Sequence, residues 1–261
     1  MIRLKQFRLF LEKSDYSRKT IEAYYSAMKY YSRFFSKTDM TSMMAYKAML
    51  IERCRPQTVN LRLRALNCYN EAMGIEGHMV FVKVQRSTFL DNVISQADYR
   101  HLWKSLEKDG YHDWSMLVRF LGSTGARISE ALQFKSEHIH AGHIDIYSKG
   151  GKVRRIYIPK ALRTDAMKWI NDNCIEGLLF RWSDASVRGR LKDFAKKYRI
   201  DESVMHPHSF RHLFGKSFIS KYKDISLLAD LMGHDSIETT RIYLMRTSAE
   251  QAAIVDRIVT W

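Results

Sequence analysis

Apolar residues recur at three- and four-residue spacing through the first 86 residues of this 261-residue chain. Ile21, Tyr24 and Met28 begin one such stripe, and Ser17 stands where an N-cap would begin the helix that carries it. A later stripe follows Pro56, a residue type favoured in the first turn of a helix. Because this spacing gathers apolar side chains on one face of a helix, the pattern predicts an all-helical bundle.

The rest of the chain mixes two periods. Alternating residues at 143–147 and 153–158 predict two strands, and Gly150 and Gly151 between them suit a hairpin turn. Helical patterns return at 160–174, 184–199, 209–222 and 225–232. The sequence therefore predicts a mainly helical fold with a small β-sheet or hairpin. It divides near residue 88 into a helical domain of residues 1–87 and an α+β domain of residues 88–261. Two domains on a short tether would close, as a clamp, around a cylinder such as duplex DNA.

The chain is strongly basic, with a formal charge of +15 and an isoelectric point near 9.7. Such an excess attracts polyanions, nucleic acid before anionic membrane. Residues 1–90 hold 16 lysines and arginines against 7 aspartates and glutamates. A basic helical bundle favours a surface that grips phosphates, although a charge run is often only a solvated face. The candidate DNA-binding residues are Arg18, Lys19, Arg55, Arg62, Arg64, Lys152 and Arg154.

The membrane alternative is weak. No run approaches the roughly 18 apolar residues of a spanning helix, and the start Met-Ile-Arg-Leu-Lys-Gln is too charged for a secretory signal. Cys54, Cys68 and Cys174 are widely spaced and form neither a CxxC pair nor a disulfide framework. We therefore expect reduced thiols and a cytoplasmic protein.

Several segments place cations where they would serve phosphoryl chemistry. Gly125 permits a tight turn before Arg127, whose guanidinium would then point outward from the first turn of a buried helix. Pro207 begins another helix, on which His208 and Arg211 share a face. Each residue also has a plainer interpretation, because an arginine near a helix start is usually a surface residue and a histidine is often a core one.

Two later segments and a hairpin complete the set. Gly233 reads as the left-handed residue that ends a helix, so that His234 emerges at a fixed angle to donate a hydrogen bond. Tyr243 follows; its hydroxyl titrates near pH 10 and becomes a nucleophile only where cations surround it. Lys149 at the hairpin tip suits a flexible proton donor to a departing 5′-oxygen, with Lys152 as its competitor. By itself, a tyrosine here would be an interface or core aromatic.

A zinc site at His208 and His212 is an alternative suggested by their i,i+4 spacing. The glutamate that a metalloprotease helix carries between two such histidines is missing. No phosphate-binding loop occurs in the sequence either. We therefore expect neither a metal nor a cofactor.

The order of these segments resembles the tyrosine recombinase (phage integrase) family. The likeness rests on Thr124-Gly125-Ala126-Arg127-Ile128-Ser129-Glu130, on Lys149 in a glycine hairpin, on His208-x-x-Arg211, on Leu231-Met232-Gly233-His234 and on Tyr243. It covers residues 90–245, and residues 1–87 are similar more loosely to the family's core-binding DNA-binding domain. The size is similar to that of Xer-like or integrase/invertase-like members, without an arm-binding domain before the bundle.

The resemblance implies a site-specific DNA recombinase. Tyr243 would attack the scissile phosphate and form a 3′-phosphotyrosyl link, while Arg127 and Arg211 would bind the non-bridging oxygens. The remaining implied roles are proton transfer and hydrogen bonding for His208 and His234, general acid for Lys149, and support of the catalytic residues from behind for Glu130.

The resemblance also implies double-stranded DNA and further copies of the chain as partners, a dimer on each site and a tetramer in the synapse. Residues 244–261 would form a tail helix that docks on a neighbouring protomer or, equally, on its own domain. Two other functions stay open: a DNA-binding architectural protein without cleavage, and a type IB topoisomerase. Integration, excision, inversion and dimer resolution are all open outcomes.

Overall fold

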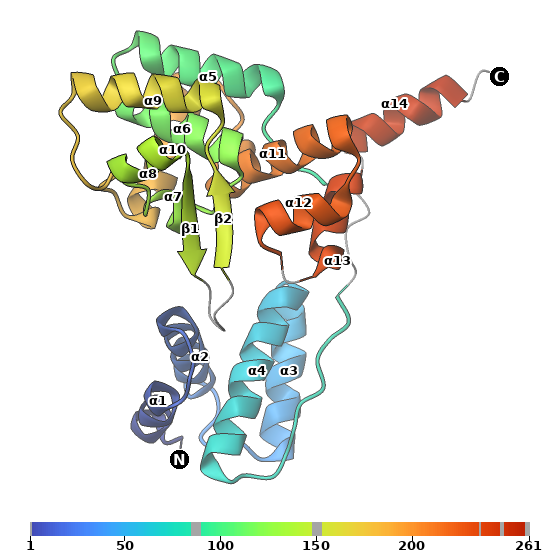
Figure 1. The fold of residues 1–261 in the computed structure, drawn as a ribbon. Helices are drawn as coiled ribbons and strands as arrows, with labels where there is room; N and C mark the ends of the chain where they lie inside the picture. The colour runs from blue at the N-terminus through green and yellow to red at the C-terminus, as the bar shows by residue number, and fades with distance from the viewer. Residues whose placement is uncertain (1, 85–89, 148–152, 235, 246–247, 259–261) are drawn as a thin grey trace. The chain divides into compact units, whose positions relative to one another are not determined.

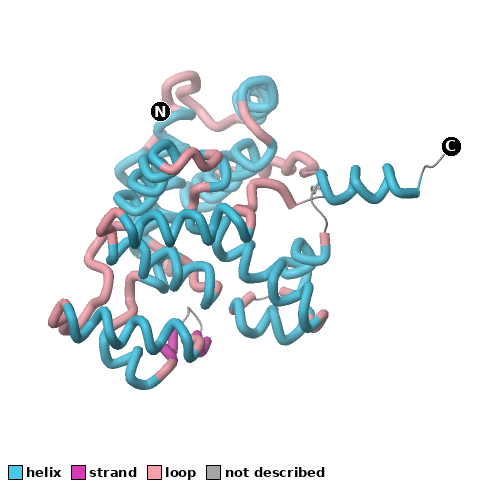
Figure 2. The backbone as a smooth tube through the Cα atoms, turned by 90° about the horizontal axis from the view of Figure 1, so that it is seen from above, coloured by secondary structure: helices cyan, strands magenta, loops and turns pink. Residues whose placement is uncertain are grey.

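The computed structural model describes residues 2–84, 90–147, 153–234, 236–245 and 248–258. These residues are mostly helical, with one two-stranded antiparallel sheet (Figures 1 and 2), which confirms the expected fold class. The chain divides into two compact units, Met1–Arg86 and Ser87–Trp261. The boundary expected near residue 88 lies outside the described residues. Within the described ranges, every helix is too short or too polar to cross a membrane.

The first unit consists of the helices α1 (Leu4–Lys13), α2 (Arg18–Tyr31), α3 (Met40–Arg53) and α4 (Pro56–Met73). Ser17 is the N-cap of α2, and its hydroxyl accepts a hydrogen bond from the amide of Thr20 at 3.2 Å. Asp39 caps α3 in the same way through the amide of Ser42 at 2.8 Å. The buried faces form one apolar core that includes Phe7, Leu11, Met28, Tyr31, Tyr46, Leu63 and Leu66.

Two asparagines of α4 hold the segment that leaves the first unit. Asn67 bonds both the amide and the carbonyl of Met79, at 2.8 and 3.0 Å. Asn60 does the same with Val82, at 2.8 and 2.9 Å. These side chains satisfy backbone groups that would otherwise need a strand as partner, so the segment is fixed along α4.

The second unit holds the remaining elements. They are α5 (Gln96–Lys108), α6 (His112–Thr124), α7 (Ile128–Ala131), α8 (Ser136–Ala141), β1 (His143–Tyr147), β2 (Val153–Tyr157), α9 (Lys160–Asp172), α10 (Asp184–Lys197), η1 (Glu202–Val204), α11 (Pro207–Tyr222), α12 (Ile225–Met232), α13 (Ile237–Thr240), η2 (Arg241–Leu244) and α14 (Ser248–Ile258). Helix α6 is buried and packs against α5 and α11, so α11 in turn presents its other side to α12 and η2.

The strands pair antiparallel, with Ile144 opposite Ile156. Both isoleucines are buried, and successive residues of a strand point to opposite faces. Arg154 therefore shares the inward face of β2 with Ile156, while Arg155 lies outside and pairs with Asp145. Because Arg154 lies on the inward face of β2, its side chain reaches the interior of the unit rather than solvent.

The helix expected after Gly125 is shorter than predicted. Gly125 ends α6 in the left-handed conformation, with φ of 63°. Helix α7 is a single turn, and Arg127 is its N-cap rather than a first-turn residue. A one-turn helix has little dipole, so the guanidinium of Arg127, and not the helix terminus, is what this turn offers to an anion.

Candidate active site

Glu130 holds Arg127 in place at the end of α6. One carboxylate oxygen accepts from the backbone amide of Arg127 at 2.6 Å, and the other accepts from its Nη1 at 2.8 Å. Nη2 of Arg127 donates to the carbonyl of Gly233 at 2.9 Å, which ties this turn to the end of α12. The side chain of Arg127 is still 39% exposed. It is therefore a fixed cation with access to solvent.

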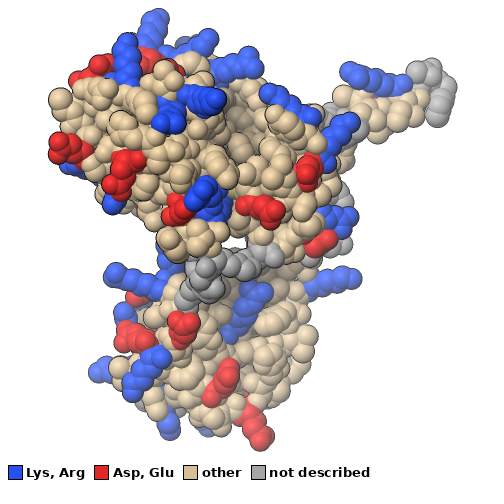
Figure 3. Space-filling model, viewed as in Figure 1, with Lys and Arg blue, Asp and Glu red and all other residues tan. Residues whose placement is uncertain are grey.

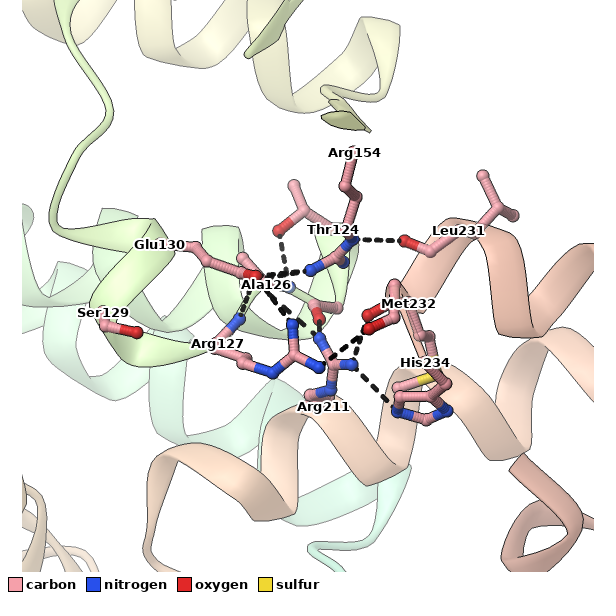
Figure 4. A network of polar contacts seen from close by, with 12 residues as sticks. Thr124, Ala126, Arg127, Ser129, Glu130, Arg154, Arg211, Leu231, Met232 and His234 are labelled. Atoms are coloured by element: carbon pink, nitrogen blue, oxygen red, sulfur yellow. Dashed lines mark hydrogen bonds and ion pairs between the residues drawn. The ribbon is translucent and has the colours of Figure 1, made fainter. Parts of the chain in front are cut away.

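Arg154 lies inside this network rather than on the surface. Its Nη1 donates to both oxygens of Glu130, at 2.8 and 2.6 Å, and its Nε donates to the carbonyl of Leu231 at 3.0 Å (Figure 4). Both side chains are less than a tenth exposed. The prediction that Arg154 binds DNA directly is therefore wrong, because its parity on β2 turns it toward the buried carboxylate. Burial alone would raise the pKa of Glu130, but the charge of Arg154 and the amide of Arg127 outweigh it and lower that pKa.

Arg211 on α11 is the second arginine of the cluster. It is 3% exposed, and its Nη1 donates to the carbonyl of Gly125 at 2.6 Å. Its Nη2 donates to the carbonyl of Met232 and to Nε2 of His234, the latter at 3.0 Å. Burial and the charges of nearby arginines lower its pKa to about 10, so it remains charged at neutral pH. Figure 4 shows the guanidinium groups of Arg127, Arg154 and Arg211 converging around Glu130.

His234 follows Gly233, which takes the left-handed conformation predicted for it, with φ of 59°. A guanidinium can only donate, so Nε2 of His234 accepts from Arg211 and its proton is on Nδ1. Nδ1 then donates to the hydroxyl of Thr240 at 2.8 Å. In this state the ring is held as an acceptor toward Arg211, and not as the free donor that we expected.

Tyr243 lies in η2 and is only 4% exposed. Its hydroxyl is 3.2 Å from Nδ1 of His212, and its ring is parallel to that of His234 within 5°, at a centroid distance of 6.3 Å. Burial raises the pKa of the phenol to about 12, although the charges of Arg211 and Arg127 oppose the shift. The structure thus brings the predicted nucleophile to the arginines and keeps it protonated.

The other predicted histidine, His208, is on α11 one turn before His212, with ring centroids 6.3 Å apart. Burial and then the charge of Arg211 lower its pKa. Prediction from sequence missed the contact of His212 with the phenol, having treated this residue only as a partner in a zinc site. In the described ranges no three His, Cys, Asp or Glu side chains come together as metal ligands do.

Lys149 and Lys152 lie outside the described residues. The basic residues predicted to bind DNA in the first unit divide into two groups. Arg18, Lys19, Arg55 and Arg64 are exposed. Arg62 is half-buried, with its guanidinium 3.9 Å above the ring of Tyr30. On the face drawn in Figure 3, lysines and arginines are spread over both units, with acidic residues among them.

Comparison with known proteins identifies the family of this chain. The model of the phage integrase family matches residues 92–250. The tyrosine recombinase XerA of Pyrococcus furiosus is 26% identical over 97% of this chain and 93% of its own length. The TnP I resolvase of Bacillus thuringiensis is 25% identical over 92% and 93%, respectively.

Two solved structures share the fold. The Tn1549 transposon integrase in complex with circular intermediate DNA has a TM-score of 0.72 at 16% identity, over 97% of this chain and 98% of that one. The XerH site-specific recombinase bound to its difH substrate has a TM-score of 0.68 at 19% identity, over 89% and 78%. The chain belongs to the phage integrase family and is, by that membership, a tyrosine recombinase.

Proposed function

We propose that this chain is a site-specific DNA recombinase that cleaves and rejoins duplex DNA through a 3′-phosphotyrosyl intermediate. The observation that carries the proposal is the convergence of Tyr243, Arg211 and Arg127 from three segments that are far apart in the sequence. A phenol beside fixed cations is what attack on a phosphodiester requires, because negative charge develops on the phosphoryl oxygens as the bond forms.

Arg127 and Arg211 differ in solvent exposure, and we assign them different roles for that reason. Arg127 and His234 line a hollow of about 530 Å³ that Arg211 and Tyr243 do not line, so the hollow gives solvent access to Arg127 alone of the two arginines. Arg211 donates to Gly125, Met232 and His234 in the described structure and also hydrogen-bonds the side chain of Tyr243, so its charge lies directly beside the phenol. We assign Arg127 to binding the phosphate from the solvent side and Arg211 to stabilising its charge from beneath.

The chemistry conserves the number of phosphoester bonds. The phenolic oxygen of Tyr243 bonds to phosphorus as the bond to the 5′-oxygen breaks, and the departing oxygen takes a proton from the general acid, assigned to Lys149. Attack by the 5′-hydroxyl of another strand reverses these events and frees the tyrosine. This route needs no nucleotide and no metal ion.

Duplex DNA is the proposed partner, with the exposed cations of the first unit gripping the backbone. Arg18, Lys19, Arg55 and Arg64 are accessible for phosphate contacts. Synapsis of two sites calls for a homotetramer. Helices α14 and α11 border a groove of about 680 Å³ that Tyr243 also lines. We propose that this groove binds the tail helix of a neighbouring protomer.

The test is covalent capture on fragmented genomic DNA that carries nicks. When a nick lies close to the cleavage site, the short strand with the new 5′-hydroxyl diffuses away. Rejoining is then impossible, and the covalent adduct is trapped. Attachment at one recurring sequence, absent in Tyr243→Phe, supports the proposal. Retained binding with no adduct would favour an architectural DNA-binding protein. Adducts without sequence preference, together with relaxation of any plasmid, would favour a type IB topoisomerase.

A further inference from the structure

His212 holds the phenolic oxygen of Tyr243. Its Nδ1 is 3.2 Å from that oxygen, and the two rings lie 5.6 Å apart at 53°. Gly215 is on the same face of α11, three residues further on, and its missing side chain makes room for the ring of Tyr243. A Cβ at Gly215 would lie 2.6 Å from a ring carbon of the tyrosine. The phenol is thus fixed between the helix backbone at Gly215 and the imidazole of His212.

His234 is poorly placed to take the phenolic proton. Its Nε2 lone pair accepts from Arg211, and its Nδ1 carries the proton shared with Thr240. Neither nitrogen of His234 therefore offers a lone pair to the phenol in this arrangement. His208 is one turn before His212 on α11, with its ring centroid 6.3 Å from that of His212.

The imidazole of His212 is neutral. Burial lowers its pKa to about 4, and the neighbouring charged or titratable groups act in the same direction, namely His208, His206, Arg211 and His234. With its proton on Nε2, Nδ1 carries a lone pair directed at the phenol. The phenol, with its pKa raised to about 12, keeps its proton until DNA is bound. Negative charge on the attacked phosphate then favours an imidazolium, so proton transfer accompanies bond formation.

We propose that His212 accepts the phenolic proton of Tyr243 as the tyrosine attacks the scissile phosphate. This inference rests on the proposed function. The O–H bond of the phenol breaks, the proton passes to Nδ1, the oxygen–phosphorus bond forms and the bond to the 5′-oxygen breaks. In the rejoining step the imidazolium returns its proton to the phenolic oxygen. Each step moves electron pairs only and needs no co-reactant.

The test measures cleavage by the His212→Asn variant of the full chain. Its substrate is a nicked duplex with the sequence that covalent capture recovers. Asparagine keeps a polar group near the position of Nδ1 but accepts no proton. General-base catalysis contributes roughly 100-fold or more, so cleavage should slow by about that factor while DNA binding is unchanged. His208→Asn is the comparison variant on the same helix; it should also slow cleavage, because His208 is itself a predicted site residue.

A fluorinated tyrosine at position 243 separates proton transfer from packing. Its phenol is more acidic and needs less help from a base, so it should recover at least tenfold of the loss in His212→Asn and leave the loss in His208→Asn unchanged. Equal stimulation of the wild-type and both variants would assign His212 a packing role and overturn the inference. So would normal cleavage by His212→Asn. If the wild-type protein forms no Tyr243-dependent adduct, the proposed function itself fails, and the inference with it.

Discussion

Arg154 and Glu130 form a buried pair in which one guanidinium nitrogen contacts both carboxylate oxygens, at 2.8 and 2.6 Å. The pair joins β2 to the turn after α6, and Nε of Arg154 continues the link to Leu231 on α12. This ion pair and its one further hydrogen bond therefore brace three segments around the site. Gly233 is part of the same brace, because a Cβ there would collide with the side chain of Arg154.

Glu130→Gln should destabilise the second unit. Removing one partner of a buried pair leaves an uncompensated charge on Arg154, which typically costs about 3–5 kcal/mol. We expect the free energy of unfolding, measured by urea denaturation, to fall by about that amount. The double variant Glu130→Gln with Arg154→Met should recover part of the loss. A single variant as stable as the wild type would show that water reaches the guanidinium.

Gly215→Ala should impair cleavage without impairing DNA binding. The added methyl group would occupy space now filled by the ring of Tyr243, so the phenol must move away from His212. Displacing a reacting group by about 1 Å can cost on the order of 100-fold in rate. The measurement is adduct formation on nicked DNA at saturating protein.

Gly189→Ala is the control for this experiment. Gly189 lies within α10, and a Cβ there meets no atom within 4 Å. Alanine at this position should stabilise the helix by about 0.5–1 kcal/mol and leave cleavage unaltered. Equal cleavage by both alanine variants would refute the claim that Gly215 positions the nucleophile.

The predictability of the site differs between its residues for a physical reason. Arg127, Arg211, His234 and Tyr243 were found from short motifs, because local helix starts and ends direct these side chains. The partners of Tyr243 depend on how α11 packs against η2, and no local pattern reports such a contact between segments. His212 and Gly215 therefore went unnoticed as neighbours of the nucleophile.

Arg154 is a different case, because the alternation of side chains in the strand already indicates that this residue points inward. Ile156 points inward, so a residue two positions earlier must do so too. A positive charge on the inward face needs a buried acid, and Glu130 was the candidate already known from the motif. The fold class and the positions of α2, α4 and α9–α12 were predictable from periodicity, whereas α3 and α6 were not assigned in advance. The single-turn helices α7 and α13 are too short to show a period.

Stability should fall in mild acid because of His212. Its pKa is about 4 in the folded protein against 6.5 ordinarily, and the pKa values of His206 and His208 are lowered as well. Between these values the unfolded chain binds more protons than the folded one. The stability is thus fully present above pH 6.5 and is lost as the pH falls toward 4.

For His212 alone, this linkage amounts to about 2 kcal/mol between pH 7 and pH 5. Urea denaturation at the two pH values measures it. His212→Asn should show a smaller decrease than the wild type by that amount. An unchanged pH dependence in the variant would mean that the ring is already solvated in the folded protein.

Arg62 and Arg64 should differ although both were predicted to bind DNA. Arg64 is exposed and lies farther from its aromatic neighbour, 5.4 Å from the ring centroid of Phe81, so Arg64→Gln should remove one phosphate contact and reduce the slope of log affinity against log salt by about 1. Arg62 stacks on Tyr30 at 3.9 Å, so Arg62→Gln should instead lower the stability of the first unit by about 0.5–1 kcal/mol. Binding titrations at several salt concentrations and thermal unfolding separate the two effects. If the salt slope changes in Arg62→Gln and not in Arg64→Gln, Arg62 is the residue that leaves its ring to contact DNA, and Arg64 makes no phosphate contact.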